Sequence, residues 1–198
     1  MPLARTYPGQ SCRHDAVHIA RGTYRLLRAL CLLLAWLPAA GAANVTPDTE
    51  YRIKTAFLYN FARFVTWPAL PQDEFRLCVL GSPQLDRHAD TLQYKTVHER
   101  RLRVLHLSDA AMLARCQMLF IGTGYTARLH EVLSALGDRP VLTVSDIAEF
   151  TRAGGMIGFL VVDNKIRFEI NAGAAERAGV SISSKLLTLA TAITARAR

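Results

Sequence analysis

Four short segments made almost entirely of apolar residues, each followed by a stretch with helical features, constrain the fold of this chain most strongly. The apolar segments occupy residues 76–81, 102–107, 118–122 and 141–145. Helices are expected after them at residues 83–92, 110–115 and 126–136, with a helical turn at 147–151. Strands that are apolar on both faces are typical of a parallel sheet covered by helices on each side. We therefore predict an α/β domain with one doubly wound, mostly parallel sheet flanked by helices.

Two further segments complete the predicted α/β fold. Residues 50–67 place Phe57, Phe61 and Phe64 at near-helical spacing, which predicts a helix with a wide apolar face that ends before Pro68. Residues 156–162 and 166–170 flank a turn sequence and predict a C-terminal β-hairpin that extends the sheet. A closing helix is expected over residues 184–195, with Ser183 as its N-cap.

The N-terminal segment has the three parts of a secretory signal peptide. Arg21, Arg25 and Arg28 precede an apolar run at residues 29–37, and small residues follow up to Ala43. The run is short and ends at a proline, which favours a cleaved signal over an uncleaved membrane anchor. We predict a signal peptide at residues 1–43, in which Val17 is an alternative start, and a periplasmic domain at residues 44–198. Export removes ATP, NAD and chromosomal DNA from the plausible ligands.

Removing the leader reduces the net positive charge. The whole chain carries +8, but five Arg and one Asp lie in residues 1–43, which leaves 19 Lys and Arg against 15 Asp and Glu, or +4. Arg100, Arg101 and Arg103 form the densest basic cluster, without the aromatic residues or the long basic helix of nucleic-acid binders. We therefore expect no nucleic-acid partner.

Only two cysteines, Cys78 and Cys116, remain after the leader is removed. An isolated pair in an oxidising compartment normally forms a disulfide, and two buried free thiols are the alternative. Metal binding is not expected, because the histidines of the domain are scattered without ligand spacing. These histidines are His88, His98, His106 and His130.

A glycine-rich turn resembles a nucleotide-binding pattern. Gly122, Gly124 and Ala127 match a loose dinucleotide motif, and Asp146 lies about twenty residues further on. The motif follows the third predicted strand rather than the first, so a glycine-bounded turn between a strand and a helix explains it better. We expect no cofactor.

Two other motifs leave a structural and a functional interpretation open. Ser183 or Ser184 beside Lys185 suggests a Ser-Lys hydrolase, but the spacing is wrong for a helical pair and helix capping explains the serines. Gly154, Gly155 and Gly158 require a bend or a close approach at a strand entrance. The following strand places Arg167 and Glu169 on one face, as a solvated surface or as part of a cleft.

Four sequence blocks together resemble the YfiR/HmsC-like family of periplasmic proteins. They are residues 54–68 (KTAFLYNFARFVTWP), 154–159 (GGMIGF), 167–171 (RFEIN) and 183–187 (SSKLL). The resemblance implies a regulator that is not an enzyme. Such a protein binds the periplasmic sensor portion of an inner-membrane diguanylate cyclase and keeps it inactive, which lowers cyclic di-GMP and limits biofilm formation.

The resemblance also implies other partners and a role for the cysteines. An OmpA-like outer-membrane lipoprotein can sequester the regulator. Apart from the resemblance, the expected exposed aromatic residues favour a homodimer. Members of the family use disulfides for stability, which fits Cys78 and Cys116. Some members carry a second cysteine pair before the glycine block, and this chain lacks it, so we expect a structural disulfide rather than a redox switch.

Candidate partner-binding or ligand-binding residues come from these blocks and their surroundings. Exposed aromatic side chains beside an arginine are typical interface anchors, which favours Tyr59, Phe64 and Trp67. The polar candidates for a small cleft are Asn60, Arg63, Arg152, Arg167, Asn171 and Lys185. The alternative functions are a small-molecule-binding module, with its ligand at the carboxyl ends of the strands, and the Ser-Lys hydrolase.

Overall fold

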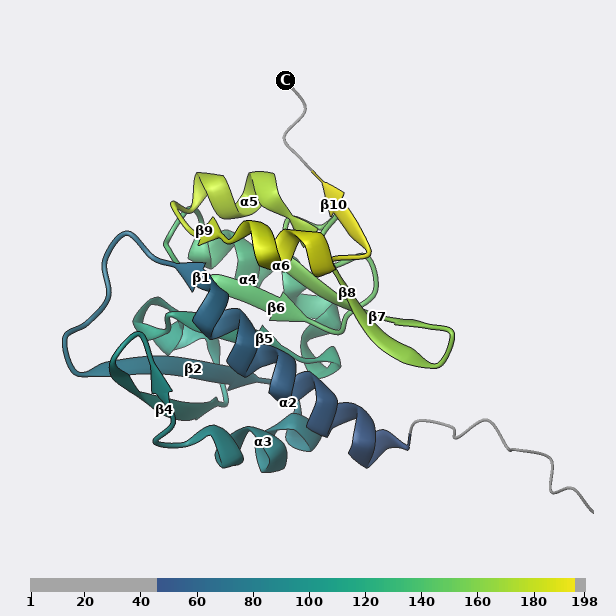
Figure 1. Ribbon diagram of the computed structural model, residues 1–198, viewed down its shortest axis with the longest axis horizontal. Coiled ribbons are helices and arrows are strands. Elements are labelled where there is room, and N and C mark those ends of the chain that lie inside the picture. Colours follow the sequence, from purple (N-terminus) through teal and green to yellow (C-terminus); the bar gives the residue numbers. More distant parts are fainter. Residues whose placement is uncertain (1–45, 195–198) are drawn as a thin grey trace, which may run out of the picture. The chain divides into compact units, whose positions relative to one another are not determined.

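The computed structural model describes residues 46–194, in which helices surround a central sheet (Figure 1). The predicted signal peptide lies outside the described residues. The strands are β1 (Val65–Thr66), β2 (Glu74–Leu80), β3 (Thr96–Val97), β4 (Arg100–Leu107), β5 (Met118–Ile121), β6 (Leu142–Ser145), β7 (Ile157–Val162), β8 (Lys165–Asn171), β9 (Ser181–Ile182) and β10 (Ala192–Thr194). The α-helices are α2 (Pro47–Phe64), α3 (Pro83–Ala89), α4 (Leu129–Leu136), α5 (Ala172–Arg177) and α6 (Ser184–Leu189). Three 3₁₀ helices are η1 (Asp90–Leu92), η2 (Ala110–Arg115) and η3 (Thr123–Arg128).

Eight of the strands form one sheet in the order β10-β8-β7-β6-β5-β2-β4-β3. Strands β4, β2, β5, β6 and β7, which are neighbours in this order, are parallel to one another. Strand β3 runs antiparallel to β4, and β8 runs antiparallel to β7. The predicted doubly wound, mostly parallel sheet and its C-terminal hairpin are therefore confirmed. Within the described residues, no helix has the length and apolar character needed to cross a membrane.

Alternate residues of the strands contribute their side chains to two separate hydrophobic layers. Leu77 and Phe120 belong to the layer under α2, which is drawn in blue across the sheet in Figure 1. Their chain neighbours Cys78 and Leu119 belong to the layer that contains α4. Because successive side chains of a strand point to opposite faces, the continuous apolar strands are buried on both sides, as the sequence pattern predicted.

Helix α2 ends three residues earlier than predicted. Thr46 caps its start, where its Oγ1 accepts a hydrogen bond from the backbone N–H of Thr49 at 3.4 Å. At the other end, Val65 and Thr66 form β1 and pair antiparallel with β9. β-Branched side chains favour this extended backbone, and a following proline restricts Trp67 to it as well. The short β1–β9 ladder thus joins the end of α2 to the segment before α6.

The predicted closing helix over residues 184–195 is wrong beyond Leu189. Helix α6 ends there, and β10 then pairs in parallel with β8, with Ile193 opposite Ile170. This edge of β8 would otherwise leave its backbone groups unpaired, so strand pairing outweighs the helical propensity of the alanines. The expected N-cap is confirmed, since Ser183 Oγ accepts a hydrogen bond from the backbone N–H of Leu186 at 3.3 Å.

Aromatic rings join α2 to the β7–β8 hairpin. Phe61 lies 5.7 Å from Phe159 and 5.1 Å from Phe168, measured between ring centroids. Phe57 contacts the same two rings at 5.9 and 5.5 Å. Rings at these separations add favourable edge and stacking interactions to their burial. This packing therefore holds together three of the four sequence blocks, residues 54–68, 154–159 and 167–171.

The predicted disulfide joins Cys78 on β2 to Cys116, two residues before β5, with 5.9 Å between their Cα atoms. Both residues are buried in the α4 layer. The bond closes a loop with a sequence separation of 38, and the loss of chain entropy in the unfolded state is worth about 4 kcal/mol for such a loop. It links two neighbouring strands of the sheet.

Replacement of both cysteines (Cys78→Ala with Cys116→Ala) is expected to lower the free energy of unfolding by about 4 kcal/mol, because the unfolded chain regains its freedom. Urea unfolding followed by circular dichroism measures the change. The wild type should lose a similar amount in a strong reductant, whereas the alanine variant should not respond. An unchanged wild-type midpoint after complete reduction would contradict a stabilising role.

His106 joins β4 to two acidic side chains of the neighbouring helical segment. Its Nδ1 lies 2.7 Å from Asp86 Oδ1, and its Nε2 lies 2.8 Å from Asp90 Oδ1. Partial burial acts to lower the pKa of His106, but the hydrogen bonds and charges of Asp90 and Asp86 outweigh it and raise the pKa above the ordinary 6.5. The folded state therefore binds the proton more tightly than the unfolded chain does.

This proton linkage predicts a pH-dependent contribution of His106 to stability. The contribution is complete below the unfolded pKa and is lost as the pH rises through the higher folded value. His106→Gln should therefore destabilise the protein more at about pH 5.5 than at about pH 8.5. Urea unfolding at both pH values tests this, with the exposed His130→Gln as a control. An equal loss for His106→Gln at both pH values would contradict it.

Candidate functional site

The crevice in which doubly wound sheets usually bind ligands is filled in this protein. It lies where the strand order reverses, at the carboxyl ends of β2 and β5. A Cβ atom added to Gly122 would lie 2.5 Å from the backbone oxygen of Gly81, so the two turns touch through their backbones. The ring of Tyr125 packs directly over Gly81, and its hydroxyl donates a hydrogen bond to the oxygen of Ser108 at 2.8 Å. The glycine motif thus has a packing role, as the turn interpretation predicts.

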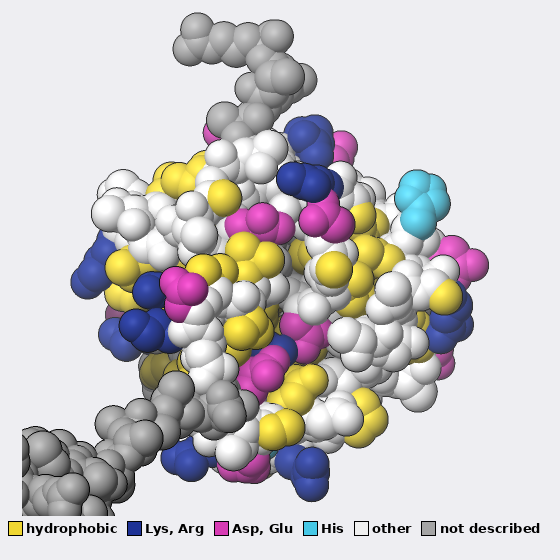
Figure 2. All heavy atoms as spheres, turned by 90° about the vertical axis from the view of Figure 1, so that its right-hand side faces the viewer, with side chains coloured by type: hydrophobic (Ala, Val, Ile, Leu, Met, Phe, Trp, Pro, Cys, Tyr) yellow, Lys and Arg dark blue, Asp and Glu magenta, His cyan; other side chains and the backbone are white. Residues whose placement is uncertain are grey.

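A hollow of about 350 Å³ opens further along the same edge of the sheet, beyond β5. Figure 2 shows this face of the molecule, with acidic side chains beside a recessed basic one and hydrophobic side chains around them. We call it the charged hollow. Its lining residues are Glu50, Tyr51, Lys54, Thr123, Asp146, Ala148, Phe159, Leu160 and Val161. Helix α2, the loops after β5 and β6, and strand β7 therefore all contribute to it.

A buried ammonium group forms the centre of the charged hollow. Lys54 Nζ lies 2.7 Å from Asp146 Oδ2 and 2.6 Å from Glu50 Oε1, and the Lys54 side chain is only 4% exposed. Glu50 and Lys54 are one helical turn apart, which places them on the same side of α2. The ammonium also lies 4.5 Å from the centre of the Tyr51 ring. Two carboxylates thus share one cation, which leaves the group with a net negative charge.

The second carboxylate oxygen of Asp146 is the unusual atom of the site. Oδ1 is buried and has no hydrogen-bond partner, and the Asp146 side chain as a whole is only 8% exposed. Such orphan acceptors are rare, because burial removes the hydrogen bonds that water would supply. This oxygen therefore lacks both a donor among the described residues and contact with solvent.

The neighbouring groups hold fixed protonation states. Burial acts to lower the pKa of Lys54, but hydrogen bonds to Asp146 and Glu50 outweigh it and raise the pKa, so the amine stays charged. Burial and the negative charge of Asp146 raise the pKa of Tyr51, so the phenol stays neutral. Because neither group changes its protonation state near neutral pH, the arrangement suits binding better than proton transfer.

Five of the predicted site residues lie on or beside the exposed side of α2. The Tyr59 ring has Arg63 at 5.6 Å and Lys95 at 5.5 Å from its centre, and Lys185 Nζ lies 5.1 Å from the centre of Phe64. Four of these predicted residues, together with Lys95, which was not predicted, form what we call the cation–aromatic face: Tyr59, Arg63, Phe64, Lys95 and Lys185. Asn60 and Tyr59 also line a shallow hollow beside Lys95. Lys185 reaches Phe64 because β1 pairs with β9.

Trp67 does not belong to this exposed side, contrary to the expectation from sequence. It is 5% exposed, its ring meets the edge of Phe75 at 5.0 Å, and its Nε1 donates a hydrogen bond to the oxygen of Gln117 at 3.0 Å. The extended backbone after α2 turns the indole into the core. Trp67 therefore stabilises the junction between α2 and the sheet.

The remaining polar candidates lie on other elements and are not gathered into one cleft with α2. Asn171 caps α5, since its Oδ1 accepts from the N–H of Ala174 at 3.0 Å, and its Nδ2 donates to the oxygen of Thr151 at 2.9 Å. Arg152 pairs with Glu149 in an exposed turn. Arg167 is exposed on β8. The structural explanation thus accounts fully for the contacts of Asn171.

The glycine block and the strand after it also have structural contacts. Thr151 Oγ1 donates to Glu169 Oε1 at 2.5 Å, and a Cβ atom on Gly158 would lie 3.1 Å from the same oxygen. Gly155 leaves room for the ring of Phe150, which packs against it. These glycines therefore allow close approach of neighbouring side chains.

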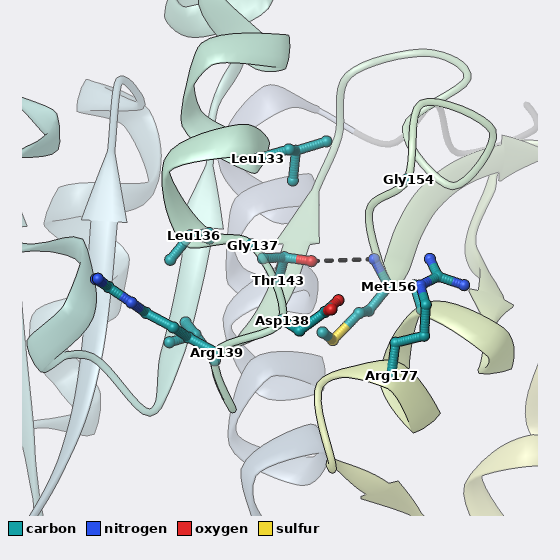
Figure 3. Close-up of a pocket in the computed structure, with 11 residues that line it drawn as sticks. Leu133, Leu136, Gly137, Asp138, Arg139, Thr143, Gly154, Met156 and Arg177 are labelled. Carbon is teal, nitrogen blue, oxygen red and sulfur yellow. Dashed lines mark hydrogen bonds between the residues drawn. The ribbon is translucent and has the colours of Figure 1, made fainter.

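A second cavity lies at the amino ends of β6 and β7 (Figure 3). Thr143 Oγ1 accepts a hydrogen bond from the N–H of Met156 at 3.0 Å, and Asp138 and Arg177 lie near Met156 in the close-up. Its volume of about 50 Å³ holds one or two water molecules. Within residues 46–194, no group of three or more His, Cys, Asp or Glu side chains has an arrangement that would hold a metal ion.

Sequence reasoning missed the charged hollow. In the sequence, Lys54 opens the first of the four sequence blocks, and Asp146 stands out only through its spacing from the glycine motif. The i,i+4 spacing of Glu50 and Lys54 is a visible signal, but it is common on helices. The decisive contact joins residues 92 positions apart, so it depends on the sheet topology.

A family model described as YfiR/HmsC-like matches residues 51–191. A conserved domain protein from Vibrio cholerae is similar in fold, with a TM-score of 0.52, 11% identity, and coverage of 73% of this chain and 60% of that chain. The ABC domain from Streptococcus pneumonia in complex with L-Trp has a TM-score of 0.44 and 9% identity over 60% of this chain and 55% of that one. This chain thus spans less than two thirds of the length of either structure.

Lys54→Met is expected to lower the free energy of unfolding by about 3–5 kcal/mol, because it leaves Asp146 buried without its cation. Arg52→Met, on the exposed side of the same helix, should change it by no more than about 0.5 kcal/mol. Thermal and urea unfolding measure both. If the two variants are equally stable, the buried ion pair does not stabilise the fold.

Proposed function

Because the chain belongs to the YfiR/HmsC-like family, we propose that it is a periplasmic negative regulator of an inner-membrane diguanylate cyclase. It binds the periplasmic portion of the cyclase more tightly in the inactive state than in the active state. A protein ligand shifts a conformational equilibrium only by such a difference in affinity. The result is a lower cyclic di-GMP level and less biofilm.

The family match over residues 51–191 is the observation that carries this proposal. It extends from the first turns of α2 to the end of α6, so the regulatory activity is assigned to the α/β domain. The Tyr125 ring over Gly81 also supports it, since the usual nucleotide-binding crevice of the fold is filled by the protein itself.

The cation–aromatic face is the surface that we assign to the cyclase. Arg63, Lys95 and Lys185 place three positive charges over or beside the rings of Tyr59 and Phe64. Aromatic residues and arginines dominate the binding energy of protein interfaces, and cations orient an acidic partner. Asn60 lies on the same side of α2 and adds a hydrogen-bonding group. We therefore expect an acidic surface on the cyclase.

Two further partners belong to the proposal. An OmpA-like outer-membrane lipoprotein would release the cyclase by competing for the regulator. A second copy of the chain would pair along β10, which is the outer strand of the sheet within the described residues and carries Ile193 at 48% exposure. Exposed apolar side chains beside an unpaired strand edge favour association.

Deletion of the gene is expected to raise cyclic di-GMP and matrix production, because the cyclase is no longer held inactive. Extracted cyclic di-GMP, measured by mass spectrometry, reports the change. The increase should disappear when the partner cyclase is also deleted. An unchanged level in the single deletion would contradict the proposed function.

The double variant Arg63→Glu with Lys185→Glu is expected to fail to restore repression in the deletion strain, because it replaces two cations with two anions. Its affinity for the cyclase periplasmic portion should fall by about tenfold or more. Arg139→Glu, a charge reversal on an exposed loop before β6, is the matched control and should repress normally. Normal repression by the double variant, at wild-type stability and abundance, would show that the cyclase binds a different surface.

A further inference from the structure

We propose that the charged hollow binds a primary ammonium group carried on a short alkyl stem. The group belongs either to a free amine or to a lysine side chain of another protein. The inference does not depend on the identity of the cyclase, because it rests on the contacts within the hollow.

The charge balance of the hollow favours a cation. Lys54 supplies the positive charge for two carboxylates, and it contacts one oxygen of each. Asp146 Oδ1 remains without a partner, and the Glu50 side chain is 28% exposed at the rim. A second ammonium would neutralise the remaining negative charge. It would also supply the hydrogen bond that Oδ1 lacks once the Asp146 carboxylate turns toward the hollow.

The walls of the hollow favour an alkyl stem. Phe159, Leu160 and Val161 of β7 contribute to the lining, and Val161 is 61% exposed although it is a large apolar residue. Lysine-like stems bury their methylene groups along such surfaces while the amine reaches a polar site. A ligand with a carboxylate in place of the amine would meet two carboxylates and one ammonium, whose net charge is negative. The hollow thus selects for the sign of the head group and for the apolar character of the stem.

A purely structural role explains less of this arrangement. One carboxylate is enough to neutralise Lys54, yet two contact it, and the more deeply buried one keeps an unused acceptor. Unpaired buried acceptors are costly unless a water molecule or a ligand supplies the donor. A water molecule would satisfy Oδ1 but would not distinguish an amine from an alcohol, and this difference can be measured.

Binding of three probes with the same five-carbon stem tests the proposal on the purified protein. Pentan-1-amine, pentan-1-ol and hexanoate differ in their head group alone. We expect pentan-1-amine to shift the NMR signals of Tyr51 and Val161 in a saturable way and to bind at least about tenfold more tightly than the other two. Equal affinities for the amine and the alcohol, or no saturable shift with the amine, would overturn the proposal.

Two variants assign the binding to the hollow. Asp146→Asn keeps the shape of the side chain but removes its charge, and it should weaken amine binding by about tenfold or more. Glu50→Gln, at the rim, should weaken it less and guards against a folding defect in the first variant. Asp138→Asn in the small cavity of Figure 3 is the control and should bind as the wild type does. Undiminished amine binding by both Asp146→Asn and Glu50→Gln, with wild-type unfolding curves, would overturn the assignment.

The source of the ammonium follows from a fourth probe. Lysine that is blocked at both its amino and carboxyl groups presents the same side chain on a peptide backbone. Binding comparable to that of pentan-1-amine supports a lysine of a protein partner, whereas binding of pentan-1-amine alone supports a free amine. Failure of the cyclase experiments would leave these measurements unaffected, so the two proposals are tested separately.

Discussion

The packing of four phenylalanine rings between α2 and the β7–β8 hairpin fixes the position of both candidate surfaces. Phe57 and Phe61 fill the inner side of the helix and contact Phe159 and Phe168. With the helix held in this rotation, its first turns bring Lys54 to Asp146, and its other side presents the cation–aromatic face. One helix thus supplies part of the core, a buried ion pair and an exposed binding surface.

The sheet was predictable because its signal is local. Strands buried on both faces are continuous apolar runs, and the structure places strands at all four of the expected segments. The errors lie at helix ends, where tertiary pairing outweighs helical propensity. Val65 and Thr66 pair with β9, and residues 192–194 pair with β8 instead of continuing α6. Neither pairing has a local sequence signal, because Val65 pairs with Ile182 and Ile193 pairs with Ile170, far apart in the chain.

The candidate sites were predictable only in part. Tyr59 was a candidate as an aromatic anchor, and Asn60 and Arg63 were candidates as polar residues of the first sequence block; all three lie on the same side of α2. Trp67 and Asn171 show the limit of this reasoning, because both lie within recurrent blocks and both make internal hydrogen bonds. The charged hollow depends on Asp146 reaching a helix 92 positions earlier in the chain, which requires the strand order. Membership of a sequence block thus does not tell whether a residue binds a partner or supports the fold.

The disulfide restrains only one half of the sheet. It links β2 to the entrance of β5, so the covalent restraint acts on the first half of the domain. The hairpin, β10 and α6 come later in the chain. The hairpin joins the rest of the sheet through only two residue pairs between β7 and β6, and β10 adds three pairs with β8. Proteins open locally where restraint is weakest, so amide hydrogen exchange should be slowest in β2 and β5 and faster in the hairpin. The β7 wall of the charged hollow thus belongs to the half of the sheet that is freer to adjust around an incoming group.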